Sequence, residues 1–329
     1  MYPPIKAIAM KKLEEIDTKI LKILLKDGRT NFTAIARNCK VSKDVIWTHY
    51  KELKKVGIIV GATIQYNFQK FGYNGFAMIM LSVESQNLTN VFSRISNISD
   101  VYAFRFYNST YNIAAISTLK NLSELEHVKQ VINKENKINE FKTQLWIDVR
   151  NIPENILADP ESQNDDVGCQ VNTQKNPARI DEIDVQIINA LTINGRLAFR
   201  TIAQQIGTTT ATVARRYEKL KENNFIKVSI QVNFLEMGYQ NILEISLAIA
   251  DQNEVNEMTN KLSKIPGVTY LVKISGNYDI SVVALVKDCK NIVEISDQII
   301  KIPNIKRMEA TLRRLPAIWP GPRQFISTF

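Results

Sequence analysis

Two segments of the sequence place basic side chains at helical spacing, and each begins with a residue that caps helices well. Residues 42–55 and 209–222 each contain four basic and two acidic side chains, and they start at Ser42 and Thr209. Within each segment, one set of apolar residues recurs on a single helical face, namely Ile46, Tyr50 and Leu53 in the first and Val213, Tyr217 and Leu220 in the second. The opposite face is polar. A helix of this kind, docked by a short preceding helix, is the arrangement that enters the major groove of DNA.

The polar faces of these two segments therefore provide our candidates for contact with double-stranded DNA. Basic side chains would position the protein on phosphates, and side chains that reach base edges would read the sequence. The candidate residues are Ser42, Lys43, Trp47, Thr48, His49 and Lys51 in the first segment and Thr209, Thr210, Thr212, Arg215, Arg216 and Lys219 in the second. An alternative is that both segments are solvated helices of a protein-interaction module, because winged helices also serve in assembly.

The two candidate helices differ where they would meet DNA. Arg215 and Arg216 in the second correspond to Thr48 and His49 in the first. Arginine binds guanine or phosphate through two hydrogen bonds, whereas a neutral histidine offers one donor and less charge. We therefore expect the second helix to supply more of the affinity, and we expect a DNA site with two dissimilar halves. Packing within the protein is the alternative role for both His49 and Trp47.

The segments around these helices occur twice in the chain. The stretch EIDTKILKILLKDGRTNFTAIARN at 15–38 matches EIDVQIINALTINGRLAFRTIAQQ at 182–205, and QYNFQKFGY at 65–73 matches QVNFLEMGY at 231–239. Internal similarity of this kind indicates a duplicated unit. Apolar residues at helical spacing predict the first helix of each unit. A purely structural pseudo-dimer, with no functional difference between its halves, is the alternative.

A second kind of domain follows each helical region. Strand and helix patterns alternate in the order βαββαβ over residues 75–149 and again over 241–315. This order is that of the ferredoxin-like split motif, in which helices cover only one face of the sheet. The other face is apolar enough to need a cover. We therefore expect the two sheets to pair within one chain as a pseudo-dimer, and we expect the chain to form homo-oligomers.

The predicted fold class is α+β, with two winged-helix-type helix-turn-helix domains and two ferredoxin-like domains in tandem. The predicted boundaries are 13–62 and 180–229 for the helix-turn-helix domains, 72–150 and 239–316 for the ferredoxin-like domains, 151–178 for a linker and 317–329 for a tail. The linker is polar and contains prolines without an apolar period, so we expect it to be flexible. The tail contains Trp319 and Phe325, which look exposed, and it would dock on a neighbouring subunit or fray.

The motifs in both helical regions resemble those of the Lrp/AsnC (leucine-responsive/asparagine) regulator family. The first helix of each unit reads D-x-x-I-[LI] from Asp17 and Asp184, and the third reads [ST]-x-x-x-[VI]-x-x-[RH]-[VY]-x-x-L. The resemblance covers nearly the whole chain, in two copies. It implies a transcriptional regulator whose ferredoxin-like domains, termed RAM domains for regulation of amino-acid metabolism, pair through their sheets and bind amino acids at assembly interfaces.

One turn in the second unit resembles the G-x-Y-D effector loop of that family. It reads S-G-N-Y-D, and its candidate effector-binding residues are Gly276, Asn277, Tyr278 and Asp279. Gly276 would permit close backbone approach, Tyr278 offers a ring face and a hydroxyl, and Asp279 can pair with a ligand ammonium. The first unit has the uncharged Asn112 instead of the aspartate. An equal alternative is a tight hairpin in which Asp279 accepts hydrogen bonds from neighbouring amides.

The composition limits other functions. The chain has 329 residues, and 42 Lys and Arg against 33 Asp and Glu give a charge of +9, which favours a polyanionic partner. His49 and His127 fall in different modules, so we predict no histidine-based catalysis and no catalytic residues. Three separated cysteines form no CxxC pair, which argues against a metal site and fits a reducing cytoplasm. No segment approaches the roughly 18 apolar residues of a membrane helix, so we predict no membrane partner. We also predict no cofactor.

Two other functions stay open at this stage. Sirohaem decarboxylases resemble this chain in domain order and in the pairing of two such units, although the scarcity of histidines and of clustered basic residues for a tetrapyrrole argues against that activity. The third function is sequence-independent, architectural DNA binding. It is favoured by the net charge and by the basic pairs Lys11-Lys12, Lys54-Lys55 and Arg313-Arg314.

Overall fold

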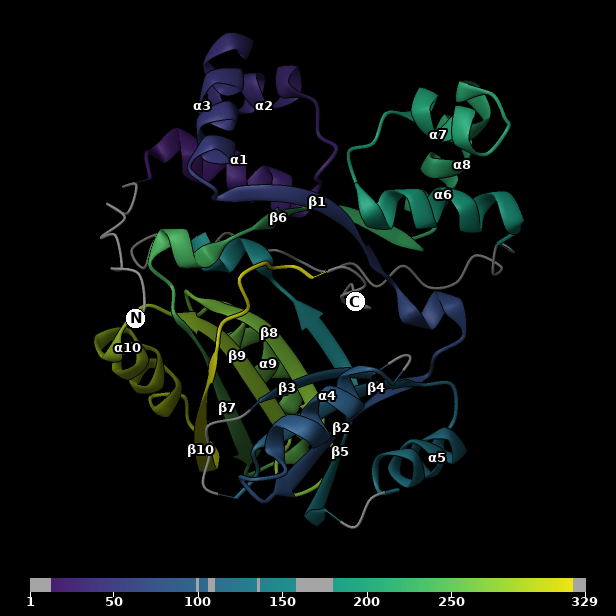
Figure 1. Ribbon diagram of the computed structural model, residues 1–329. Helices are drawn as coiled ribbons and strands as arrows, with labels where there is room; N and C mark the ends of the chain where they lie inside the picture. Colours follow the sequence, from purple (N-terminus) through teal and green to yellow (C-terminus); the bar gives the residue numbers. More distant parts are fainter. Residues whose placement is uncertain (1–12, 99–100, 106–109, 135–136, 158–179, 322–329) are drawn as a thin grey trace, which may run out of the picture.

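The computed structural model describes residues 13–98, 101–105, 110–134, 137–157 and 180–321 (Figure 1). Lys11 and Lys12, most of the predicted linker and the tail beyond residue 321 lie outside the described residues. The observed fold is mixed helix and sheet, as the sequence predicts. Within the described residues, no helix is both long and apolar enough to cross a membrane.

Each half of the chain begins with a three-helix head. The first head contains α1 (Glu15–Lys26), α2 (Phe32–Cys39) and α3 (Lys43–Lys55), and the second contains α6 (Glu182–Ile193), α7 (Phe199–Gln205) and α8 (Thr210–Glu222). Capping explains where α3 and α8 begin. The Ser42 hydroxyl accepts a hydrogen bond from the Val45 amide, and the Thr209 hydroxyl accepts one from the Thr212 amide.

A two-stranded antiparallel ribbon joins the two heads. It consists of β1 (Ile59–Tyr66) from the first half and β6 (Ile226–Val232) from the second, and both heads lie on the side of it away from the large sheet (Figure 1). The packing is crossed. Ile64 of β1 lies in the core of the second head, while Ile230 and Val232 of β6 lie in the core that includes the first head. Each head is therefore completed by a strand from the other half.

Both ferredoxin-like domains have the predicted βαββαβ order. In the first half the elements are β2 (Gly75–Val83), α4 (Leu88–Ser96), β3 (Val101–Arg105), β4 (Ile113–Leu119), α5 (Leu122–Ile132) and β5 (Ile138–Asn151). In the second half they are β7 (Asn241–Ile249), α9 (Val255–Leu262), β8 (Val268–Ile274), β9 (Ile280–Val286), α10 (Cys289–Ile300) and β10 (Ile305–Arg314). Short 3-10 helices, η1 (Phe68–Phe71) and η3 (Phe234–Met237), connect the ribbon to these domains.

The two ferredoxin-like sheets form one continuous sheet that folds back on itself. The strand order is β10-β7-β9-β8-β5-β2-β4-β3, and the pairing of β5 with β8 joins the halves. The Arg313 guanidinium of β10 nevertheless lies 4.5 Å from the ring centroid of Phe104 in β3, so the two outermost strands face each other. The faces without helices therefore cover one another, and Trp146 packs in the same cluster as Tyr270 and Val272. The sequence predicts this face-to-face cover but does not predict the edge pairing.

The first residues of the predicted linker differ from expectation. Residues 153–157 form the 3-10 helix η2 (Pro153–Leu157), which contacts α1 and β8. Ile156 and Asn155 are buried, and the Tyr239 hydroxyl donates a 2.6 Å hydrogen bond to the Ile156 carbonyl. Burial also raises the pKa of Tyr239 to about 12. The polar composition of the segment gave no signal of these tertiary contacts.

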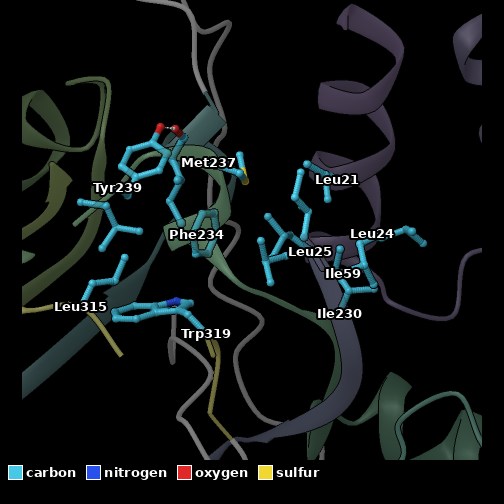
Figure 2. Packing of buried hydrophobic residues seen from close by; sticks show 14 of the residues in the cluster. Leu21, Leu24, Leu25, Ile59, Ile230, Phe234, Met237, Tyr239, Leu315 and Trp319 are labelled. Atoms are coloured by element: carbon cyan, nitrogen blue, oxygen red, sulfur yellow. Dashed lines mark hydrogen bonds between the residues drawn. The ribbon is translucent and has the colours of Figure 1, made fainter. Parts of the chain in front are cut away.

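The described part of the tail also differs from expectation, because Trp319 is buried within its own chain. Its side chain is 5% exposed and lies beside Tyr270, with ring centroids 5.4 Å apart. The backbone of Trp319 exchanges two hydrogen bonds with Val232 of β6. Figure 2 shows the indole close to Leu315 and Phe234. The tail thus returns from the large sheet to the ribbon beneath the heads.

Candidate nucleic-acid interface

Most of the predicted DNA-contacting residues lie on the exposed faces of α3 and α8. The exposed ones are Ser42, Lys43, Trp47, Thr48 and Lys51 in the first head and Thr209, Thr210, Arg215 and Lys219 in the second. Several of the hydroxyls already form hydrogen bonds within their own helices. Besides the two capping hydroxyls, the Thr48 hydroxyl donates to the Asp44 carbonyl at 2.9 Å. The basic side chains Lys43, Lys51, Arg215 and Lys219 are therefore the groups that each helix presents outward.

His49 and Arg216 point back into their own heads. His49 Nδ1 lies 2.8 Å from Oδ1 of Asp17, which is fully buried in α1. Arg216 occupies the same position in the second head and donates to Asp181 and to Asp184 at the start of α6. Its side chain is 20% exposed. Each residue thus ties the third helix to an acidic residue at the start of the first helix.

This geometry changes the role predicted for Arg216. A guanidinium that already satisfies two carboxylates loses those hydrogen bonds when it turns to DNA, and Oδ1 of the buried Asp184 then loses this donor. Hydrogen bonding to the two carboxylates raises the pKa of Arg216. The hydrogen bond from Arg216 is also the main reason why the pKa of Asp181 is lowered. The exposed arginine of α8 is instead its neighbour, Arg215.

Trp47 is half exposed at the surface of the first head. Its ring lies 5.4 Å from Phe32 and 6.1 Å from Tyr50, and the Lys51 ammonium lies 4.9 Å from its centroid. The side chain is 42% exposed. One face of the indole is thus packed within the head, and the remaining surface is available beside Lys51. Ala214, at the equivalent position of α8, presents no ring.

Two arginines that were not among the predicted site residues connect the heads. Arg29, in the turn after α1, donates from Nη1 to the carbonyls of Gly195 at 2.8 Å and Leu197 at 3.0 Å. Arg196, in the turn after α6, donates to the Gly28 carbonyl at 2.6 Å. The only sequence signal for this contact is the Gly-Arg pair that both repeats share.

The glycines of the same turns allow the heads to approach the ribbon closely. The amide of Gly28 donates to Val228 of β6, and that of Gly195 donates to Ala62 of β1, both at 2.8 Å. A Cβ on Gly195 would lie 2.9 Å from the Thr63 backbone nitrogen. Contacts this short with backbone atoms force the turn away from the ribbon.

We therefore expect Gly195→Ala to lower the free energy of unfolding by about 1–3 kcal/mol, because the added methyl group overpacks a backbone contact. Urea denaturation monitored by circular dichroism measures this change. Gly75→Ala is the matched control, since its Cβ would come no closer than 3.9 Å to the Trp146 carbonyl oxygen. Equal stability of the two variants would contradict the close approach at Gly195.

The predicted effector loop forms the turn between β8 and β9. Asp279 Oδ2 accepts a 2.7 Å hydrogen bond from the Ile249 amide, and Oδ1 accepts one from the Gln252 side chain. The Tyr278 hydroxyl donates to Glu309 at 2.7 Å, which raises the pKa of Tyr278. Gly276 has φ of +118° and is exposed with Asn277. The hydrogen bonds of the aspartate thus run to the end of β7 and to the residue Gln252 after it, and not to amides within the β8–β9 turn.

The equivalent turn of the first unit uses an amide for the same purpose. Asn112 accepts a 3.1 Å hydrogen bond from the Val83 amide and donates one to the Val83 carbonyl. The Tyr111 hydroxyl donates to Glu140 at 2.8 Å, as Tyr278 does to Glu309. The tyrosines and the Asn112 and Asp279 side chains thus make equivalent hydrogen bonds in the two turns, and the turns differ in charge at that last position.

Sequence comparisons identify the family. Models of a winged helix-turn-helix DNA-binding domain, an AsnC-type helix-turn-helix domain and the Lrp/AsnC ligand binding domain match residues 13–60, 180–221 and 240–313. An uncharacterized HTH-type transcriptional regulator of Pyrococcus abyssi is 30% identical over 137 residues, which are 41% of this chain and 92% of that protein. The chain belongs to the Lrp/AsnC family of helix-turn-helix transcriptional regulators.

A second relative matches in the same proportion. The HTH-type transcriptional regulator Ptr1 of Methanocaldococcus jannaschii is 27% identical over 135 residues, which are 40% of this chain and 90% of Ptr1. A match of this length corresponds to about one of the two units described above. That the two units arose by duplication stays a prediction.

One solved structure is similar over nearly the whole chain. The sirohaem decarboxylase NirDL aligns with a TM-score of 0.63 at 14% identity, covering 95% of this chain and 94% of NirDL. At this identity the likeness shows a shared fold alone. The aligned part of this chain covers both heads and both ferredoxin-like domains.

Proposed function

We propose that this Lrp/AsnC-family chain is a sequence-specific transcriptional regulator that reads two dissimilar DNA half-sites with α3 and α8. The observation that carries the proposal is the presence, within one chain, of two capped third helices with exposed basic faces on the same side of the β1–β6 ribbon (Figure 1). Basic residues on such helices bind phosphate, and the neighbouring side chains reach base edges.

The two heads would contact DNA through different chemistry. In the second head, Arg215 is an exposed arginine that can bind a guanine or clamp a phosphate. In the first head, Lys51 and the exposed edge of Trp47 take that place, offering a point charge and an apolar surface. His49 and Arg216 act indirectly in this proposal, because their acidic partners hold the two helices in place.

Selection of bound sequences from a random pool of duplexes tests this proposal. A regulator of this kind enriches one bipartite sequence, with half-sites spaced by about one helical turn or a multiple of it. The enriched duplex is then competed against unrelated DNA at fixed salt. Equal competition by unrelated DNA would favour the architectural alternative, in which affinity depends on charge alone.

An amino-acid effector is the second part of the proposal. Gly276 and Asn277 are exposed beside Tyr278, so a small ligand can approach the backbone of the turn. A ligand ammonium would replace the Gln252 side chain on Asp279. Calorimetric titration with the individual amino acids, in wild type and in Asp279→Asn, tests this site. Heat of binding that is unchanged in the variant would exclude the aspartate as a ligand contact.

Tetrapyrrole decarboxylation is the second candidate function, and the full-length fold similarity to NirDL favours it. The facing sheets place Arg313 between them, but this side chain lies 3.6 Å from Glu244, which balances its charge. A polycarboxylate gains little from a balanced arginine. We therefore propose that the protein is not an enzyme. A stable shift in the absorbance spectrum of added sirohaem, reversed by Arg313→Ala, would revive this candidate.

We also propose that the chain is divided as predicted, into heads at 13–62 and 180–229 and ferredoxin-like domains at 72–150 and 239–316. The same proposal places the protein in the cytoplasm, where a transcriptional regulator meets DNA. Assembly of further chains into homo-oligomers would bring additional heads to the same DNA. Sedimentation with and without the selected duplex measures the number of chains bound.

A further inference from the structure

We infer that Arg29 and Arg196 are positioning residues that fix the separation of α3 and α8, so that one chain accepts half-sites at a single spacing. This inference rests on the proposed DNA-binding function. Each arginine lies in one head and makes its contacts in the other. The two residues therefore hold one head in place relative to the other, and they do not connect elements within a single head.

The contacts of Arg29 extend to the third helix of the second head. Its guanidinium lies 4.2 Å from the ring centroid of Phe199 and 5.3 Å from that of Tyr217, a residue of α8. Those two rings are themselves 5.2 Å apart. With the carbonyls of Gly195 and Leu197, they surround the guanidinium on its face and along its edge. Movement of α8 relative to the first head breaks these contacts.

Arg196 makes the reciprocal set. Its guanidinium lies 5.2 Å from Phe32 and 5.6 Å from Tyr50, a residue of α3, and those two rings are 4.9 Å apart. Burial lowers the pKa of Arg29, and the nearby charge of Arg196 lowers it further. The two like charges are stabilised by the opposite head, because two carbonyls accept from Arg29, one accepts from Arg196, and aromatic rings lie beside both.

The ribbon supports the same geometry from below. The Thr63 hydroxyl of β1 donates to the Thr192 carbonyl at the end of α6, and the Ser229 hydroxyl of β6 donates to the Leu25 carbonyl at the end of α1. These side chains belong to opposite halves of the chain from the helices they contact. Each first helix is thus bonded to the other unit's strand at one end, and the arginines fix the turn that follows it.

One further contact makes the connection unequal. Lys221, near the end of α8, lies 2.7 Å from Asp27 in the first head. The equivalent pair is Lys54 and Asn194, which cannot form an ion pair because asparagine is uncharged. Helix α8 is therefore connected to the first head by both Arg29 and Lys221.

A fixed head separation has a specific consequence on DNA. Half-sites separated by an extra half turn, about 5 base pairs, face opposite sides of the duplex, whereas a full turn restores their direction. Rigid heads bind only the correct phase, so inserting about 5 base pairs should lower the affinity of wild type at least about 10-fold, to that of one half-site. Heads that move independently tolerate the insertion better.

The experiment compares wild type with Arg29→Ala/Arg196→Ala on the selected operator, on the same operator with about 5 base pairs inserted, and on a single half-site. The expected result is a small insertion penalty for the double variant and an unchanged affinity for the single half-site. Arg150→Ala is the control, since Arg150 is a half-buried arginine of β5 that donates to Asn260 of α9, away from both heads. A double variant that keeps the full penalty would overturn the inference.

A second measurement does not require DNA. Nitroxide labels at Lys55→Cys and Glu222→Cys, in chains with Cys39, Cys169 and Cys289 replaced by serine, report the distance between the heads. We expect one narrow distribution in the labelled parent and a broader one after both arginines are removed. If the parent binds no selected DNA, the proposed function fails while this distribution still decides the inference. Equal widths would contradict it.

The variant Arg29→Lys/Arg196→Lys tests the inference in case the alanine variant does not fold. Lysine keeps the charge but lacks the planar guanidinium that donates to carbonyls and stacks on rings. We expect this variant to unfold cooperatively, to bind the single half-site as wild type does, and to show an insertion penalty between those of wild type and the alanine variant. A penalty equal to that of wild type would show that charge alone holds the heads, contrary to the inference.

Discussion

Replacing Trp319 with alanine is expected to lower the free energy of unfolding by about 3–5 kcal/mol, the range for large aromatic side chains removed from a core. Trp319 is 5% exposed and lies beside Tyr270, Leu315 and Phe234 (Figure 2). Without the indole, the tail loses the side chain that holds it against β6. Urea denaturation of the full chain measures the loss.

Ile318→Ala is the matched control for this prediction. Ile318 precedes the tryptophan, but its side chain is 44% exposed, so its removal creates little cavity. We expect the control to change stability by well under about 1 kcal/mol. A Trp319 variant as stable as the Ile318 variant would mean that the tail contributes nothing to the packing between ribbon and sheet.

The second large effect is expected on DNA binding. Arg215→Ala should weaken binding to the selected operator by about 1–3 kcal/mol, or roughly 5- to 150-fold, because it removes an exposed arginine from the face of α8. Thermal stability should stay close to that of wild type. Fluorescence anisotropy at one salt concentration measures the affinity, and a melting curve checks the fold.

Two related variants separate a DNA contact from an effect on folding. Thr48→Ala changes the equivalent position of the first head and should weaken binding much less, since its hydroxyl bonds the Asp44 carbonyl. Arg216→Ala should mainly lower the stability of the fold, because it removes the guanidinium that donates to the buried Asp184. If Arg215→Ala left affinity unchanged while Arg216→Ala reduced it without destabilising the fold, the assignment of the two arginines would be reversed.

The local elements of the fold could be predicted from the sequence because their signals are local. Period-3.6 apolar patterns with Ser42 and Thr209 as caps define the third helices, and alternating strand and helix patterns define the βαββαβ order. The family matches confirm the predicted fold class and the predicted family. These features depend on residues a few positions apart.

The relations between elements could not be predicted in the same way. Pairing of β1 with β6 and of β5 with β8 depends on residues from different halves of the chain, and no single segment encodes it. Trp319 looks exposed in a proline-rich tail because its partners, Tyr270 and Val232, are distant in sequence. The buried start of the predicted linker was missed for the same reason.

The candidate site shows the same division. The polar faces of α3 and α8 follow from helical periodicity, but the partners of individual side chains do not. His49 and Arg216 were candidates for DNA contact because of their residue types and their positions in the third helices, and the structure pairs them with Asp17 and Asp184. Arg29 lies in a turn, where no periodicity indicates that it reaches the opposite head.

The affinity of wild type for three duplexes tests most directly whether one chain reads DNA with two unlike heads. One duplex carries the selected operator, and the other two are perfect palindromes built from each half-site. We predict that the selected operator binds more tightly than either palindrome. Binding to either palindrome that equals or exceeds binding to the operator would contradict two heads of different specificity.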